Sequence, residues 1–160
     1  MAFDEVKEYF EKHNLADRIK VFDISTATVK QAAEALGCDE ANIAKTIAFN
    51  VNNEPILIVL AGDMKANNSK FKQTFKTKLK MLNYEETQDL IGHKVGGVCP
   101  FVIKPNVKVY LDISLKRFDF VYPAAGSANS GIKLSIDELA KHSNYVDWVD
   151  ISTQINSSGI

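Results

Sequence analysis

The chain is short of the residue types that define several large classes of protein. Its two cysteines, Cys38 and Cys99, belong to no CxxC motif and lie in no cysteine–histidine cluster, which argues against a disulfide framework and against a zinc site. Lysine and arginine total 19 against 20 acidic residues, so the formal net charge is -1 and the basic balance of a general nucleic-acid coat protein is excluded. A polyanionic partner must therefore bind to a local patch.

Long hydrophobic runs are also missing. No stretch reaches the roughly 18 apolar residues of a membrane helix, and the first segment, MAFDEVKEYF, carries acids where a secretory signal has an apolar run. We therefore expect a cytoplasmic protein with no membrane partner. No repeat, low-complexity tract or Pro/Gly/Ser linker divides the 160 residues, so one domain over 1–152 and a polar tail over 153–160 are predicted.

What is present is a mixture of helix and strand signals. Phe3, Val6 and Phe10 fall at helical spacing in a charged background, which predicts a first helix. Three capping boxes, TxxQ at 28–31, NxxE at 83–86 and SxxE at 135–138, predict the starts of three more. A further, lysine-rich helix is expected near 69–77.

Strand patterns are more numerous than helix patterns. Two aliphatic runs, 43–51 and 55–62, are separated by Asn-Asn-Glu, which predicts a hairpin. Further strands are expected at VKVYLD, FDFVYP, GIKLS and YVDWVDI. Because several of these strands are joined by short turns, we expect an α+β fold, in which a mixed, largely antiparallel sheet is curved or barrel-like and has helices around it.

The segment HKVGGVCPFVIKP, residues 93–105, combines two glycines, a cysteine and a proline. It is either a plain turn whose Cys99 is a small core residue, or a loop that lets the backbone approach a ligand and aim N–H groups at a developing oxyanion. A third alternative, Cys99 as a nucleophile, needs a nearby base or cation to ionise the thiol, and the sequence does not place His93 beside it.

Two other features have both a structural and a functional interpretation. Lys45 is an isolated cation in the apolar segment NIAKTIAF, so it is either a surface lysine or a pocket lysine that holds a phosphate or polarises a carbonyl. The stretch GSANSGIKLS, 126–135, is either a hairpin loop or a pocket rim whose Ser127 and Asn129 offer hydrogen-bond partners.

The segment 64–80, MKANNSKFKQTFKTKLK, carries lysines and no acid. Such a run is either a solvated helix face or the patch with which a nearly neutral protein contacts the phosphates of a nucleic acid. The candidate phosphate contacts are Lys65, Lys70, Lys72, Lys76 and Lys78.

Taken in order, AAEALG, IAKTIAF, LAGD, GHKVGGVCPF, VYLDISL and AAGSANSGIKLSIDEL resemble the YbaK and prolyl-tRNA-synthetase-associated editing domain family over about residues 20 to 142. The resemblance implies that Lys45 is the family's pocket lysine and that Gly96 and Pro100 end its GxxxP loop, with Gly97 and Cys99 inside it. Lys45, Gly96 and Gly97 are then the catalytic candidates, and Cys99 and Pro100 are substrate-binding candidates.

The far wall of the pocket is implied in the same way. Asp112, at the end of VYLD, and Gly126 with Ser127 match it, and Asn129 is added as a hydrogen-bonding candidate. Residues 124–126 read Ala-Ala-Gly where many relatives have paired glycines, so the shape of this wall and the amino acid that it accepts stay open.

The function that the resemblance implies is a trans-acting deacylase that hydrolyses mischarged tRNA, typically tRNA for proline carrying a small non-cognate amino acid. No metal or cofactor is expected, because an aminoacyl ester is already activated and needs only a positioned nucleophile and a stabilised oxyanion. The expected partners are the acceptor end of a tRNA and a prolyl-tRNA synthetase, with no DNA. The alternative is a non-catalytic module that binds a tRNA end or nucleotide and docks on a synthetase.

Overall fold

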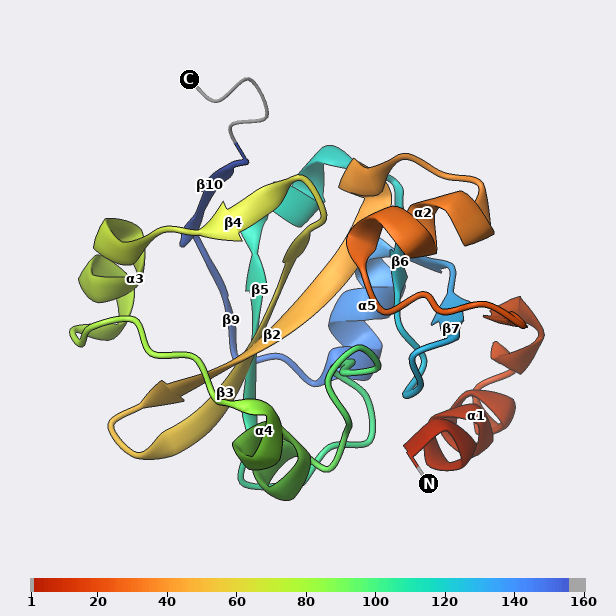
Figure 1. The fold of residues 1–160 in the computed structure, drawn as a ribbon, viewed down its shortest axis with the longest axis horizontal. Coiled ribbons are helices and arrows are strands. Elements are labelled where there is room, and N and C mark those ends of the chain that lie inside the picture. Colours follow the sequence, from red (N-terminus) through yellow and green to blue (C-terminus); the bar gives the residue numbers. More distant parts are fainter. Residues whose placement is uncertain (1, 156–160) are drawn as a thin grey trace.

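The computed structural model describes residues 2–155 (Figure 1). Its main sheet has the strand order β8-β6-β2-β3-β5-β9 and curls into a half-barrel. The strands are β1 (Ile19–Val21), β2 (Ile43–Val51), β3 (Glu54–Ala61), β4 (Met64–Ala66), β5 (Lys108–Asp112), β6 (Phe120–Pro123), β7 (Ser130–Ile132), β8 (Leu134–Ser135), β9 (Asp147–Val149) and β10 (Ser152–Gln154). The predicted α+β class with a mixed, curved sheet is confirmed.

The β2/β3 hairpin is the centre of the sheet. Its strands pair antiparallel from Ala44 opposite Ala61 to Val51 opposite Glu54. The two turn residues, Asn52 and Asn53, have φ values of 52° and 67°, the left-handed conformations that a two-residue hairpin turn requires and that asparagine tolerates. Parallel strands continue the sheet on either side, with β6 next to β2, and β5 and then β9 beyond β3.

The described residues form five helices, three of which begin where a capping box predicts. They are α1 (Ala2–Lys12), α2 (Val29–Leu36), α3 (Asn68–Phe75), α4 (Tyr84–Ile91) and α5 (Ile136–Ser143), with short turns η1 (Ala16–Arg18), η2 (Glu40–Asn42) and η3 (Ile113–Arg117). All three predicted capping boxes form, at the starts of α2, α4 and α5. Gly37 and Gly92 end α2 and α4 with φ of 70° and 93°, as a left-handed C-cap requires.

Both faces of the hairpin are covered. Leu57 and Val59 join one core cluster, with Phe10 of α1 and Phe101, whereas Ile58 alternates to the opposite face and packs in a second cluster. That second cluster contains Phe71 of α3, which lies at the opposite end of the molecule from α1 (Figure 1). A strand buried on both faces needs apolar residues at every position, which explains the uninterrupted run PILIVLA.

Two expectations for the later part of the chain were wrong. The segment GIKLS is not one strand, because β7 pairs with β1 whereas β8 pairs with β6. The expected polar tail begins inside a strand, because β10 pairs antiparallel with β4. Asp112 holds the start of this strand, since its carboxylate accepts the Ile151 N–H and the Ser152 hydroxyl. Residues 156–160 of that tail lie outside the described part. None of the described helices is long and apolar enough to span a membrane.

Candidate active site

A cavity of about 280 Å³ lies at an open edge of β2. Along this edge β6 pairs only with Ile43 and Ala44, because it ends at Pro123 and a proline has no N–H to extend the ladder. The ladder resumes at the bridge from Phe49 to Met81. Between these points, no strand in residues 2–155 pairs with residues 45–47 on this side, and the cavity fills the gap.

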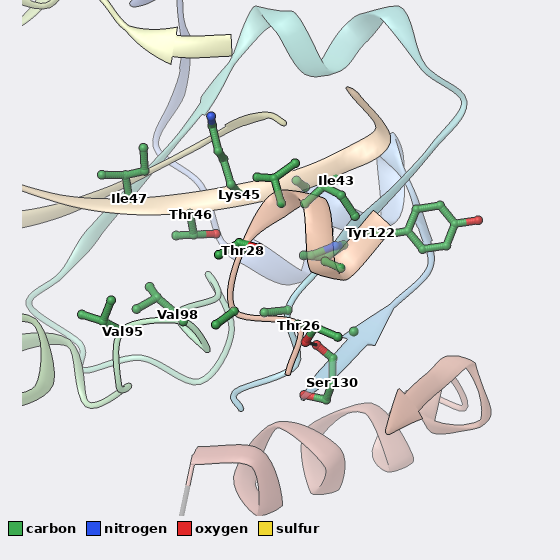
Figure 2. A pocket seen from close by; sticks show the side chains of 18 of the residues that line it. Thr26, Thr28, Ile43, Lys45, Thr46, Ile47, Val95, Val98, Tyr122 and Ser130 are labelled. Atoms are coloured by element: carbon green, nitrogen blue, oxygen red, sulfur yellow. Dashed lines mark hydrogen bonds between the residues drawn. The ribbon is translucent and has the colours of Figure 1, made fainter. Parts of the chain in front are cut away.

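The cavity wall is largely apolar. Helix α2 and the segment before it, the strand β2, the loop at 95–98 and the end of β6 supply most of the lining residues (Figure 2). The apolar members include Ala27, Val29, Ala32, Ile43, Val95 and Val98, and the polar members include Thr26, Thr28, Thr46 and Ser130. The cavity therefore suits a ligand that has a small apolar part attached to a polar part.

The glycine loop forms one side of the cavity through Gly96 and Val98. Gly96 has φ of 95°, which disfavours any side chain, and a Cβ there would lie 3.0 Å from the Ala27 Cβ. Neither the Gly96 nor the Val98 N–H has a hydrogen-bond partner among residues 2–155. This backbone can therefore approach and donate to a bound group.

Gly97 has a different role in the same loop. A Cβ on Gly97 would lie 2.7 Å from both the Cα and the carbonyl carbon of Ser127, so only glycine allows the two backbones to touch. Gly97 is absent from the cavity lining, and its N–H donates to the Lys94 carbonyl. The structure thus places this catalytic candidate behind the wall, where it sets the position of the loop.

His93 holds the loop from the core side. Its Nδ1 accepts the Cys99 N–H at 3.3 Å, so the proton of the neutral ring lies on Nε2, which donates to the Val102 carbonyl at 3.4 Å. Burial lowers the pKa of His93. This residue was not among the sequence candidates, because its partners are six and nine positions away in a loop without regular periodicity.

Cys99 lies in the core and does not line the cavity. Burial raises the pKa of its thiol to about 12, so the sulfur is protonated at neutral pH. The Sγ lies 3.8 Å from His93 Nδ1, but that nitrogen already accepts the Cys99 N–H. Pro100 is also buried and outside the lining, so neither substrate-binding candidate in the loop reaches the cavity.

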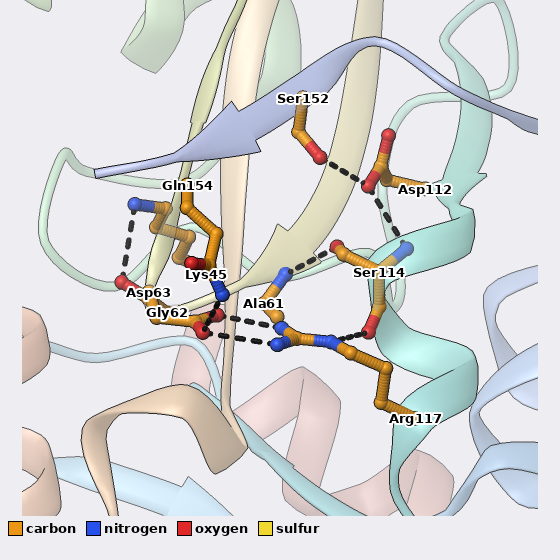
Figure 3. Close-up of polar contacts among 9 residues, drawn as sticks. All are labelled: Lys45, Ala61, Gly62, Asp63, Asp112, Ser114, Arg117, Ser152 and Gln154. Atoms are coloured by element: carbon orange, nitrogen blue, oxygen red, sulfur yellow. Dashed lines mark hydrogen bonds and ion pairs between the residues drawn. The ribbon is translucent and has the colours of Figure 1, made fainter. Parts of the chain in front are cut away.

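Lys45 is part of the cavity lining, but its ammonium points away from Val95, Val98 and Thr46 (Figure 2). The Nζ donates to the Gly62 carbonyl at 3.4 Å, close to Asp63 (Figure 3). Burial lowers the pKa of Lys45, and the Asp63 carboxylate opposes that shift.

Asp63 itself is held by Arg117, which donates from two guanidinium nitrogens at 2.6 and 3.0 Å. The Arg117 hydrogen bonds lower the pKa of this carboxyl. Lys45 therefore has one long hydrogen bond, while its acidic neighbour is engaged by a stronger partner. Its ammonium is available to an incoming anion.

Asp112 does not reach the cavity. Its carboxylate is buried and accepts the Ser114 N–H and the Ser152 hydroxyl (Figure 3). It also accepts the Ile151 N–H. The role implied for it in the far wall is therefore replaced by a structural role, in which it caps η3 and fixes β10.

The turn at 126–129 supports the cavity from outside. Gly126, with φ of 91°, packs against the backbone of α1. The Ser127 hydroxyl donates to Asn129 Oδ1 at 2.8 Å and contacts the Ser130 hydroxyl at 2.6 Å, while Asn129 Nδ2 donates to the Phe22 carbonyl. From this segment it is Ser130 and Gly131 that line the cavity, so the predicted rim is shifted along the chain.

The candidate tRNA contacts differ among themselves. Lys70 is occupied by the protein, since its Nζ contacts Asp150 at 3.0 Å and the Ser152 carbonyl at 2.8 Å. The other four, Lys65, Lys72, Lys76 and Lys78, are exposed. Within residues 2–155 no group of three His, Cys, Asp or Glu side chains is arranged to hold a metal ion.

Comparison with known proteins gives a consistent result. The family model described as "Aminoacyl-tRNA editing domain" matches residues 24–142. The chain is 43% identical over 152 residues to YwhH, an uncharacterised protein of Bacillus subtilis, covering 94% of this chain and 97% of that one. It is 29% identical over 107 residues to a proline–tRNA ligase of Aquifex aeolicus, which is 66% of this chain and 19% of the ligase.

Among solved structures, the fold matches a candidate trans-editing enzyme for prolyl tRNA synthetase. The TM-score is 0.84 at 23% sequence identity, and the match covers 95% of this chain and 97% of that one. At this level of identity the likeness concerns the fold.

Proposed function

Because the chain belongs to the aminoacyl-tRNA editing domain family, we propose that it acts in trans as a deacylase that hydrolyses the ester of mischarged tRNA, with tRNA for proline carrying a small non-cognate amino acid as the preferred substrate. The observation that carries the proposal is the cavity at the open β2 edge. It is small and largely apolar, and it is flanked by the unpaired N–H groups of Gly96 and Val98 and by Lys45.

The reaction needs few side chains. Water adds to the ester carbonyl carbon, the bond from that carbon to the ribose oxygen breaks, and the water proton passes to that oxygen, leaving free amino acid and tRNA. Negative charge develops on the carbonyl oxygen in between, and preorganised N–H donors such as those of Gly96 and Val98 stabilise it. Losing one donor of this kind typically costs about 3 kcal/mol in the transition state.

Lys45 supplies the positive charge at the rim. Its ammonium is held by a single 3.4 Å hydrogen bond, so it can turn to a phosphate of the terminal nucleotides at little cost. A lysine acts here as a point charge without the fixed geometry of arginine, which suits a flexible single-stranded end. Proline–tRNA synthetase is the expected partner, since the chain resembles part of such ligases.

The test is deacylation by the purified protein of a panel of mischarged tRNAs, with release of free amino acid as the measurement. Lys45→Ala should lower the rate at least about tenfold with little loss of stability, because a rim lysine contributes little packing. Lys133→Ala is a matched control, since Lys133 lies over the Phe120 ring and away from the cavity. Binding of charged tRNA without release of any amino acid would favour the non-catalytic alternative.

A further inference from the structure

Thr46 has an unusual environment within the cavity. Its Oγ1 is the one buried side-chain nitrogen or oxygen in residues 2–155 that has no hydrogen-bond partner. An unpaired buried hydroxyl destabilises the folded protein, because its hydrogen bonds to water are lost on folding and not replaced. A free protein that keeps such a group at a cavity wall is poised to satisfy it with a ligand.

The backbone of Thr46 is unpaired as well. On the open edge of β2 the Ala48 carbonyl accepts the Leu82 N–H, and the Asn50 N–H donates to the Lys80 carbonyl. Because the N–H and C=O of alternate residues in a strand point to the same edge, both groups of Thr46 also point to this edge. No strand in residues 2–155 pairs with them there.

The direction of the side chain agrees with this geometry. Thr46 lies on the same side of β2 as Thr28 and Val98, whereas Lys45 points to the other side (Figure 2). Thr46 therefore presents an unpaired N–H and C=O to one small cavity whose remaining wall is largely apolar, and its unpaired hydroxyl is buried directly behind this edge, where rotation about the Cα–Cβ bond would bring it to a ligand. These are the groups with which a strand edge recognises one residue of an added strand.

We propose that Thr46 binds the aminoacyl group of the substrate as if it were one residue of an added β-strand, so that a free α-amino group is required. The α-ammonium donates to the Thr46 carbonyl and Oγ1, and the ester carbonyl oxygen accepts the Thr46 N–H. That N–H then joins Gly96 and Val98 at the oxyanion. The inference rests on the proposed deacylase function and adds the class of substrate, aminoacyl esters but not N-acylated ones.

The arrangement also sets which way the amino acid side chain points. With its α-nitrogen and carbonyl oxygen both fixed on the strand edge, the Cα substituent of an L-residue has one direction, which we place in the largely apolar cavity. A cavity of about 280 Å³ leaves room for a small side chain beside the ester.

The test compares alanyl-tRNA with N-acetyl-alanyl-tRNA made on the same tRNA. Acetylation removes the charge and two of the three donors of the ammonium, so kcat/KM of the wild-type protein, divided by the rate at which each ester hydrolyses spontaneously, should fall at least about tenfold, as expected for the loss of a hydrogen bond to a charged group. Hydrolysis of both substrates at equal rates would overturn the inference and leave the deacylase function intact. Hydrolysis of neither, nor of any other aminoacyl-tRNA, would overturn the proposed function itself.

Thr46→Val tests the hydroxyl with the strand shape preserved. The variant should melt at the same or a higher temperature, because an unpartnered buried hydroxyl is removed, yet hydrolyse alanyl-tRNA about tenfold more slowly. Thr87→Val is the matched control. Thr87 also lines the cavity, but its hydroxyl donates to the Asn83 carbonyl, so its loss should lower stability and leave the ratio between the two substrates unchanged.

The variant results decide the role of Oγ1. Wild-type rates in Thr46→Val would remove the hydroxyl from substrate binding, and a lower melting temperature of this variant would show that Oγ1 is satisfied in the free protein. Either result overturns its proposed role. Thr46→Ser, which keeps the hydroxyl, should restore most of the rate.

Discussion

Replacing Gly97 with alanine tests whether the contact between the glycine loop and the turn at 126–129 holds the cavity wall in place. Gly97 does not have a left-handed backbone conformation, so alanine there adds no backbone strain and the variant tests the effect of steric crowding alone. The new Cβ would lie 2.7 Å from the Ser127 Cα and carbonyl carbon and 2.9 Å from its nitrogen. Carbon atoms normally approach to about 3.5 Å, so the two backbones must separate by roughly 1 Å.

The expected energetic cost is that of overpacking, about 1 to 3 kcal/mol, since all three crowded atoms are backbone and none can rotate away. Gly37→Ala is the matched control. Gly37 has φ of 70°, and nothing lies within 4 Å of the place that an added methyl group would take, so alanine there suffers about 1 to 2 kcal/mol of backbone strain without crowding anything. The two variants therefore lose similar stability for different reasons.

Single-turnover deacylation, measured well below both melting temperatures, separates these reasons. Gly97→Ala should lose at least about tenfold in rate, because a displacement of about 1 Å at a catalytic loop can cost up to about a hundredfold. Gly37→Ala should stay close to wild type. If Gly97→Ala melts and reacts like the wild-type protein, the loop and turn are not rigidly coupled and the reasoning is refuted.

Three further predictions concern the loop and the lysine segment. The pKa of His93 in the folded protein lies below its ordinary value of 6.5, so as the pH falls the unfolded chain is protonated at this residue before the folded protein is. The stability that neutral His93 contributes is therefore complete above pH 6.5 and is lost as the pH falls. His93→Asn keeps an acceptor for the Cys99 N–H but does not titrate, so its free energy of unfolding in urea should fall less on acidification than that of the wild-type protein. The same pH dependence in both proteins would contradict this. Cys99→Ala should cost about 1 kcal/mol in a thermal melt yet retain deacylation, whereas a thioester trapped on Cys99 would reverse that conclusion. Lys72→Glu/Lys76→Glu should flatten the log–log salt dependence of tRNA binding by about 0.7 to 0.9 per contact and spare a minimal aminoacyl-adenosine substrate; equal losses on both substrates would assign the helix to the fold.

The fold and family were predictable because their signals are local. The capping boxes at 28–31, 83–86 and 135–138 and the Asn-Asn turn at 52–53 each depend on residues within four positions of one another, and all formed as expected. The resemblance carried by the GxxxP loop and Lys45 is confirmed by the family match over residues 24–142. A family's motifs can be identified from their residues and their order in the chain, even when the residues that pack against them in the fold are not known.

The strand assignments failed where pairing is set at long range. Nothing in the polar letters STQ marks a strand, and β10 forms because β4 and the buried carboxylate of Asp112 supply its hydrogen-bond partners. The same contacts account for Asp112 itself, which the sequence placed at the pocket. The sequence does not distinguish an aspartate at a strand end that binds a ligand from one that accepts hydrogen bonds from the protein's own backbone.

The geometry of the candidate site also depends on contacts between segments that are distant in the sequence. The sequence predicts the starts of three helices and most of the strands, and its resemblance to the family implies that a lysine and a glycine loop belong to one site. Only the folded sheet leaves the edge of β2 open at Thr46, and only the packed loop sets Gly97 against Ser127 and His93 against Cys99. The physical reason is that caps and turns are satisfied by neighbours in the chain, whereas an unpaired strand edge and a backbone contact depend on segments distant in the sequence.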